Sequence, residues 1–285
     1  ECEFLGSVDT LISPSKLRIM PYHDPMKEHR GLAVFEQAVP EHNYVITVDV
    51  SRGVGSDYSA FTVMDTTTIP YKMVARYKNN EIKPIVLPNI ITDVAKNYNN
   101  AYILCEVNDI GGQVADIIQY DLEYENLLMC SMRGRAGQQL GQGFSGKKTQ
   151  LGIKMSTAAK QVGCSNLKAL IEDDKLLIND YDTIAELTTF IAKGQTFQAE
   201  EGCNDDLAMC LVIFAWMAMQ PYFKEMHDND VRQRIYEDQR DAIEQDMAPF
   251  GFINDGMDDE YFADAQGDVW KVAEYGDKSY MWEFR

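Results

Sequence analysis

Carboxylates interrupt two apolar segments whose composition is typical of β-strands. In residues 43–65 (NYVITVDVSRGVGSDYSAFTVMD), Asp49 ends an apolar run and Asp57 follows a glycine-bearing turn. Glu106 directly follows a second apolar run, YILC. A buried carboxylate is costly unless a hydrogen bond or a cation compensates it. These three positions are therefore the first candidates for chemistry.

A metal ion is the natural partner for Asp49 and Glu106. If their strands are neighbours in one sheet, the backbones lie about 5 Å apart. Two carboxylates at that spacing repel, and one takes up a proton unless a cation neutralises both. Mg²⁺ or Mn²⁺ suits a site of few carboxylates that keeps some water. We therefore expect a site for a hard divalent cation.

Two further carboxylates, Asp205 and Asp206, precede the apolar segment 207–219 (LAMCLVIFAWMAM). This segment is too short to span a membrane and is expected to form a buried helix. Acidic residues favour helix N-termini, so the pair could simply cap the helix. Alternatively, Asp206 and Asp205 lie at the same sheet edge as further metal ligands. Asp57, beside the first strand, is another candidate ligand.

Histidine and cysteine chemistry is disfavoured. All four histidines lie outside residues 43–220, which argues against a zinc site or a histidine base in the core. The six cysteines form no CxxC pair and are expected to be free thiols in a reducing compartment.

The charge distribution is uneven. A net charge of −19 argues against nucleic-acid binding by the body of the protein. Residues 126–171, however, contain no Asp or Glu. This stretch predicts a phosphate-binding face, with a solvated loop and helix as the alternative. The expected phosphate contacts are Arg133, Arg135, Lys147, Lys148, Lys154 and Lys160.

The order of expected elements defines the fold class. Strands are expected at 44–50, 58–65, 71–79, 101–107 and 126–132, with helices at 84–99 and 111–124. A glycine-rich loop or hairpin (133–150) and helices near 153–174, 183–194 and 207–219 follow, with Gly194 closing the second of these. This order predicts an α/β domain with a ribonuclease-H-like mixed sheet flanked by helices, in which the first and fourth strands are adjacent.

Four segments together carry a resemblance to a known family. They are VITVDVSRGVGSDYSAFTVMD, YILCEVND, VGCSNLKALIEDDKLLI and EEGCNDDLAMCLVIFAWM. The set resembles the nuclease domain of a tailed-bacteriophage terminase large subunit, nearest in pattern to the T-even DNA-packaging motors. The resemblance runs from about residue 4 to 220. One departure is Asn204, where the family often has His before the acidic pair.

The resemblance implies a metal-dependent DNA endonuclease that cuts concatemeric viral DNA during headful packaging, with little sequence specificity. It implies Asp49, Glu106 and Asp206 as catalytic residues that bind two Mg²⁺ or Mn²⁺ ions, with Asp205 and Asp57 as further ligands. Implied partners are double-stranded DNA, the portal protein, the small terminase subunit and an N-terminal ATPase domain of the full-length chain. The implied location is the host cytoplasm, transiently on the procapsid portal, without membrane association.

The expected organisation has three parts. Residues 1–42 are expected to be a linker or the trailing edge of the ATPase region, 43–222 the nuclease domain, and 223–285 a charged helix and acidic tail. A near-match to a phosphate loop, GQGFSGKK at 141–148, has Lys148 in place of the hydroxyl residue and no strand leading into it. A monomer is expected, because no heptad pattern is present.

Two other function classes remain open at this stage. The strand, turn and strand around Asp49 are also compatible with an actin-like or sugar-kinase-like ATP-binding domain, although no second such hairpin is found. The third class is a catalytically silent portal-docking module, in which the acidic, aromatic-bearing tail binds a partner.

Overall fold

The structure is a computed structural model that describes residues 9–52, 57–132, 137–141 and 149–226, and the backbone of three short strands after residue 260. The chain divides into two compact units, Glu1–Asp228 and Asn229–Arg285. Arg133, Arg135, Lys147 and Lys148 lie outside the described residues, as do the phosphate-loop-like segment (apart from Gly141) and the predicted charged helix beyond residue 226.

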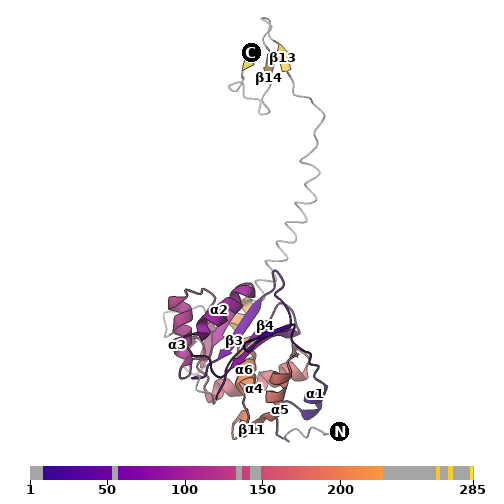
Figure 1. Ribbon diagram of the computed structural model, residues 1–285, viewed down its shortest axis with the longest axis vertical. Coiled ribbons are helices and arrows are strands. Elements are labelled where there is room, and N and C mark those ends of the chain that lie inside the picture. Colours follow the sequence, from indigo (N-terminus) through magenta and orange to yellow (C-terminus); the bar gives the residue numbers. More distant parts are fainter. Residues whose placement is uncertain are drawn as a thin grey trace. The chain divides into compact units, whose positions relative to one another are not determined.

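The first unit is built on a mixed sheet of strand order β1-β2-β5-β4-β3-β6 (Figure 1). Its central strands are β3 (Tyr44–Asp49), β4 (Ser59–Asp65), β5 (Tyr71–Asn79) and β6 (Tyr102–Cys105). Neighbours β3, β4 and β5 are antiparallel, whereas β3 and β6 are parallel. The predicted adjacency of the first and fourth expected strands is confirmed.

The N-terminal segment contributes to this sheet. A helix, α1 (Pro14–Ile19), precedes a hairpin of β1 (Lys27–His29) and β2 (Leu32–Val34). Strand β2 pairs antiparallel with β5. Part of the segment expected to be a linker is thus continuous with the sheet of the first unit.

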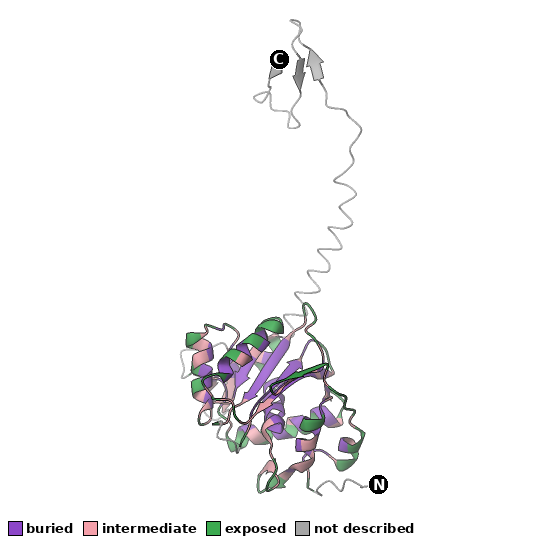
Figure 2. Ribbon diagram, in the orientation of Figure 1, coloured by how far each residue is buried: buried purple, intermediate pink, exposed green. Residues whose placement is uncertain are grey.

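Helices cover both faces of the sheet (Figure 1). On one side lie α2 (Leu87–Asn97) and α3 (Gly111–Asp116), and α3 continues into a π-helix, η1 (Ile117–Asp121). On the other lie α4 (Thr157–Glu172), α5 (Tyr181–Thr189) and α6 (Asp206–Ala218). The central strands between these layers are buried, as Figure 2 shows.

Strand alternation divides the core into two clusters. Ile46, Val48 and Ile103 belong to the cluster that includes α2 and α3. Val45 and Leu104 belong to the cluster that includes α4 and α6. Because successive side chains point to opposite faces of a sheet, this division fixes which face each later residue of β3 and β6 addresses.

Helix α6 is the apolar helix expected from the sequence. Every residue from Leu207 to Ala218 is buried. Gly163 of α4 allows close packing, since a Cβ there would lie 2.6 Å from the Val212 carbonyl oxygen of α6. Within the described part of the chain, none of the helices combines the length and apolarity that membrane crossing needs.

The predicted end of one helix is wrong. Helix α5 stops at Thr189, and Phe190–Lys193 forms β11, which pairs with β12 (Thr196–Ala199). Gly194, at φ +64°, lies in the turn between these strands rather than closing a helix. Backbone hydrogen bonds from Leu11 to Phe190 and from Ala192 to Asp9 hold β11 extended. These partners are remote in sequence, so the local pattern could not reveal them.

Shorter strands complete the two units. In the first unit β7 (Met129–Met132) pairs with β8 (Gln138–Gly141) and β9 (Thr149–Leu151), and β10 (Leu176–Leu177) pairs with β5. The hairpin expected for the glycine-rich segment is thus present where that segment is described. The second unit contains an antiparallel sheet of β13 (Tyr261–Ala263), β14 (Val269–Lys271) and β15 (Glu283–Phe284).

Candidate active site

Strand register brings Asp49 and Glu106 together. Val48 of β3 is the partner of Cys105 of β6 in a parallel ladder, and the Glu106 backbone N–H donates to the Val48 carbonyl at 2.9 Å. Asp49 and Glu106 are the next residues on each strand. The two carboxylates therefore lie at adjacent carboxyl ends of parallel strands, as the sequence predicts.

Both carboxylates lie on the face of the sheet that packs against α6. The alternation that sends Val45 and Leu104 toward α4 and α6 places Asp49 and Glu106 on that same face. Thr47, between Val45 and Asp49, is fully buried and donates its hydroxyl to the Cys210 carbonyl of α6 at 2.9 Å. This contact ties the helix to the strand that carries Asp49.

Two glycines pack closely against the backbone at Cys105 and Glu106. A Cβ on Gly111 would lie 1.9 Å from the Glu106 carbonyl oxygen, and a Cβ on Gly152 would lie 2.3 Å from that of Cys105. Gly152 also has φ +76°, a conformation that other residues rarely adopt. The strand end is therefore held by two close backbone approaches that require glycine.

The acidic pair lies at the N-terminus of α6. Asp205 occupies the N-cap position, but its side chain makes no capping hydrogen bond. Its Oδ2 accepts from the Ala199 N–H of β12 instead, at 3.2 Å. Asp206 accepts a backbone hydrogen bond from Tyr58, next to β4. The alternative of a simple N-cap is thus wrong for Asp205, since the side chain is used elsewhere.

The carboxylates form one electrostatic group. Burial raises the pKa of Asp49 well above its ordinary value, and the charges of Glu106, Asp206 and Asp205 raise it further. Burial raises the pKa of Glu106 to about 7 and that of Asp206 to about 6. Desolvation and mutual repulsion cause these elevated carboxyl pKa values, and a bound cation would relieve both.

Lys160 of α4 partly compensates this group. Its Nζ lies 4.0 Å from Asp205 Oδ2 and over the Phe190 ring, 5.6 Å from the centroid. Its charge lowers the pKa of both Asp49 and Glu106. The sequence predicts Lys160 as a DNA contact, and the structure places it beside the carboxylates.

Asn108 forms a hydrogen bond with the carboxylate of Glu106. Its Nδ2 donates to Glu106 Oε1 at 2.6 Å and to the Met155 carbonyl at 3.1 Å. Its Oδ1 is buried without a hydrogen-bond partner, and it is the only such side-chain atom among the described residues. An unsatisfied buried acceptor beside these carboxylates fits a site that would hold a cation or its bound water.

The donor set fits a hard divalent cation in chemical type. All the candidate donors are carboxylate or amide oxygens, the ligands that Mg²⁺ and Mn²⁺ prefer. In the present arrangement of the described side chains, no three Asp, Glu, His or Cys residues converge closely enough to hold one ion. The electrostatic grouping is the better guide to the site, because small rotamer changes move ligand oxygens whereas the strand and helix positions are set by the core.

The remaining predicted residues lie at the periphery. Asp57 is exposed, just before β4, and its carbonyl accepts from the Ser51 hydroxyl. Lys154 is exposed, and its backbone N–H donates to Gln138 Oε1 at 2.9 Å. The described structure thus assembles Asp49, Glu106, Asp205, Asp206 and Lys160, and it leaves Asp57 and Lys154 at the surface.

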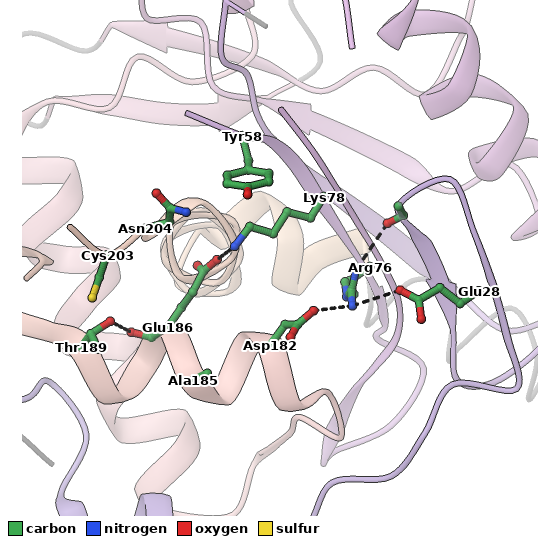
Figure 3. Close-up of a pocket in the computed structure, with 11 residues that line it drawn as sticks. Glu28, Tyr58, Arg76, Lys78, Asp182, Ala185, Glu186, Thr189, Cys203 and Asn204 are labelled. Carbon is green, nitrogen blue, oxygen red and sulfur yellow. Dashed lines mark hydrogen bonds and ion pairs between the residues drawn. The ribbon is translucent and has the colours of Figure 1, made fainter. Parts of the chain in front are cut away.

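Sequence reasoning missed three neighbours of the site. Asn108 was visible only as part of the CEVND run. Lys78 of β5 and Glu186 of α5 form an ion pair and line a pocket of about 530 Å³ (Figure 3), and the charge of Lys78 lowers the pKa of Asp206. Neither stands out locally, because Lys78 ends an alternating strand and Glu186 lies in an ordinary amphipathic helix. Their importance comes from tertiary contacts alone.

Comparison with known proteins settles the family. The sequence model described as "Terminase RNaseH-like domain" matches residues 46–217, more than half of the chain. This chain belongs to the terminase RNase H-like nuclease domain family. The match covers β6 and most of β3 and α6, the three elements that carry the candidate site of this terminase domain. The alternative of an actin-like ATP-binding domain is accordingly set aside.

Solved structures agree on the fold of this terminase domain. The large terminase nuclease of thermophilic phage G20c with bound magnesium matches with a TM-score of 0.54 and 20% identity, over 74% of this chain and 97% of that one. The same nuclease with bound cobalt matches with a TM-score of 0.55 and 22% identity, over the same shares. At these identities the comparison establishes the RNase H-like arrangement.

Proposed function

We propose that this terminase domain is a metal-dependent DNA endonuclease that cuts concatemeric viral DNA during headful genome packaging. One observation carries the proposal. Asp49 and Glu106, at the ends of adjacent parallel strands, share a desolvated site with Asp205 and Asp206 at the start of α6. A structural role does not call for Asp49, Glu106 and Asp206 to be desolvated together next to the charge of Asp205.

The proposed metal ligands are Asp49, Glu106 and Asp206, with Asp205 and Asp57 as additional ligands. Asp49 is central, since it interacts electrostatically with Glu106, Asp205 and Asp206. Its position suits a ligand shared between two ions. The G20c relatives with magnesium and cobalt support divalent-cation binding in this fold. When bound, two Mg²⁺ or Mn²⁺ ions would activate water and stabilise the leaving 3′ oxygen of a phosphodiester.

The remaining residues have supporting roles in this proposal. Lys160 balances the negative charge of the carboxylates, and Asn108 fixes the orientation of Glu106. Lys154, together with Arg133, Arg135, Lys147 and Lys148, binds the phosphate backbone. Backbone contacts carry no sequence information, so cutting is expected to be weakly specific. The acidic body of the chain keeps DNA affinity low in isolation.

The proposed partners follow from the packaging role. They are double-stranded DNA, the portal protein, the small terminase subunit and the ATPase domain of the full-length chain, in the host cytoplasm at the procapsid. The acidic segment after residue 222 is the proposed docking element. Portal docking is compatible with nuclease activity and does not replace it.

Plasmid cleavage tests the proposal. The 285-residue chain is expected to nick and linearise supercoiled plasmid with Mg²⁺ or Mn²⁺ and to be inactive with EDTA. Asp49→Asn should abolish cleavage, because the amide keeps the shape of the side chain but removes the ligand charge. Asp65→Asn is the matched control, since Asp65 is also the last residue of a sheet strand but lies at the far end of the β3–β4 ladder.

Two results would contradict the proposal. One is a folded parent that shows neither cleavage nor binding of Mn²⁺. The other is an Asp49→Asn variant that cleaves as well as the parent in a preparation whose activity survives an additional chromatography step. The second result would trace the activity to a contaminant or to another site.

A further inference from the structure

Glu186 contacts the N-terminus of α6 from outside that helix. Its Oε2 accepts the backbone N–H groups of Leu207 and Ala208, at 2.8 and 3.0 Å. Its Oε1 accepts from Lys78 Nζ at 2.5 Å (Figure 3). Glu186 is buried, so this carboxylate is committed to the helix end and to one lysine.

These hydrogen bonds provide the acceptor that an N-cap side chain normally provides. The first N–H groups of a helix have no acceptor within the helix, and the N-cap residue usually supplies one. In α6 the N-cap residue is Asp205, and its side chain makes no such bond. If Asp205 or Asp206 capped the helix, its oxygens would be drawn toward the backbone and away from the sheet edge. Because Glu186 supplies the acceptor for Leu207 and Ala208, neither Asp205 nor Asp206 has to turn toward those two N–H groups.

Lys78 connects this cap to the site. Besides its ion pair with Glu186, Lys78 lies over the Tyr58 ring, 4.5 Å from the centroid. Tyr58 in turn provides the backbone hydrogen bond to Asp206. The Glu186–Lys78 pair therefore contacts both the N-terminus of α6 and Tyr58, which donates to Asp206. The positive charge of Lys78 also lowers the pKa of Asp206.

We propose that Glu186 is a positioning residue that caps α6 in place of Asp205 and so presents Asp205 and Asp206 to the metal. The proposal rests on the proposed function, since it takes these carboxylates as metal ligands. Glu186 itself touches neither substrate nor metal in this scheme. Its effect passes through the backbone of Leu207 and Ala208.

The test compares Glu186→Leu and Glu186→Gln with the parent chain by two measurements. Amide hydrogen exchange without metal should show faster exchange of Leu207 and Ala208 in Glu186→Leu, with the rest of α6 unchanged. Mn²⁺ binding, followed by titration calorimetry, should weaken about tenfold or more, the usual effect of losing an outer-shell partner. Glu186→Gln keeps an acceptor oxygen, so its exchange rates and its Mn²⁺ affinity should lie between those of Glu186→Leu and those of the parent.

Asp180→Asn is the matched control for a purely structural role. Asp180 is also buried, caps a helix through the Thr183 N–H at 2.9 Å, and pairs with Arg76 at 3.4 Å, but it serves α5. It should lower the melting temperature without weakening Mn²⁺ binding. If Glu186→Leu behaves in the same way, with lower thermal stability and parental Mn²⁺ affinity, the positioning role is overturned.

The two proposals fail in different ways. A parent chain that binds no Mn²⁺ removes the proposed function, as stated above. Unchanged exchange at Leu207 and Ala208 in Glu186→Leu removes the cap, whatever the parent does with metal. Faster exchange together with weaker Mn²⁺ binding supports the positioning role.

Discussion

Asp49 and Glu106 follow directly on Val48 and Cys105, which are partners in the parallel pairing between β3 and β6. The hydrogen bond from the Glu106 N–H to the Val48 carbonyl extends that pairing to the edge where the carboxylates lie. A shift of one residue in this register would send one of the two carboxylates to the opposite face. The strand pairing itself is therefore part of the site.

Metal-free protein should lose stability as the pH rises. Burial raises the pKa of Glu106 to about 7 and of Asp206 to about 6, above their ordinary values. The folded state thus binds more protons than the unfolded chain, so the free energy of unfolding falls with pH between about 4.5 and 7. Urea unfolding in EDTA at several pH values measures this slope, and saturating Mg²⁺ should reduce it.

Asp49→Asn should stabilise the metal-free protein near neutral pH. The substitution removes the charge that repels Glu106 and Asp206, and the gain is expected to be on the order of 1 kcal/mol. The sign is the informative part, because most buried substitutions destabilise. A destabilised variant in EDTA at pH 7.5 would mean that the carboxylates do not repel one another in the folded chain.

Gly111→Ala should impair cleavage, whereas Gly112→Ala should not. A Cβ at Gly111 meets the Glu106 carbonyl oxygen at 1.9 Å, so the strand end must move. A Cβ at Gly112 has its nearest neighbour at 3.9 Å, and alanine there should be neutral or slightly stabilising. Metal affinity and plasmid cleavage of the two variants measure the difference. Equal activity would show that the position of Glu106 tolerates this shift.

Lys154→Gln and Lys160→Gln should have different effects. Lys154 is exposed, so its loss should weaken DNA binding and reduce the salt dependence by about one counterion. Lys160 lies 4.0 Å from Asp205, so its loss should act mainly on the carboxylates and on cleavage at saturating DNA. Fluorescence anisotropy over a range of salt concentrations, together with single-turnover cleavage, separates the two. If the two variants show the same salt dependence and the same cleavage rates, Lys160 acts as a DNA contact, as Lys154 is expected to do.

Asn108→Ala should raise the metal concentration needed for half-maximal cleavage. The substitution removes the hydrogen bond to Glu106 Oε1 and leaves that carboxylate free to rotate. A loss of about tenfold in metal affinity is expected for such a partner. Asn126→Ala is a suitable control, because Asn126 also donates its side-chain amide to a carbonyl, that of Asn100, but does so at an exposed position. An unchanged metal requirement in Asn108→Ala would show that Glu106 is held by other contacts.

The sequence by itself determined the central strands and the candidate carboxylates of this domain. Asp49 and Glu106 were recognisable because each ends a short apolar run, where alternation and burial make a carboxylate unusual. The apolar helix after Asp206 was recognisable because thirteen consecutive apolar residues have no polar face to expose. These are local signals, and periodicity reads them reliably.

Only the tertiary structure decided how the site is held. Glu186 caps a helix that starts about twenty residues later, and Lys78 reaches Glu186 from a strand more than a hundred residues earlier. The extended conformation of Phe190–Lys193 likewise depends on partners near the N-terminus. Contacts between residues remote in sequence leave no periodic trace, because each partner satisfies its local pattern equally well without the other. The carboxylates that the structure brings together could therefore be predicted, whereas the residues that hold them in place could not.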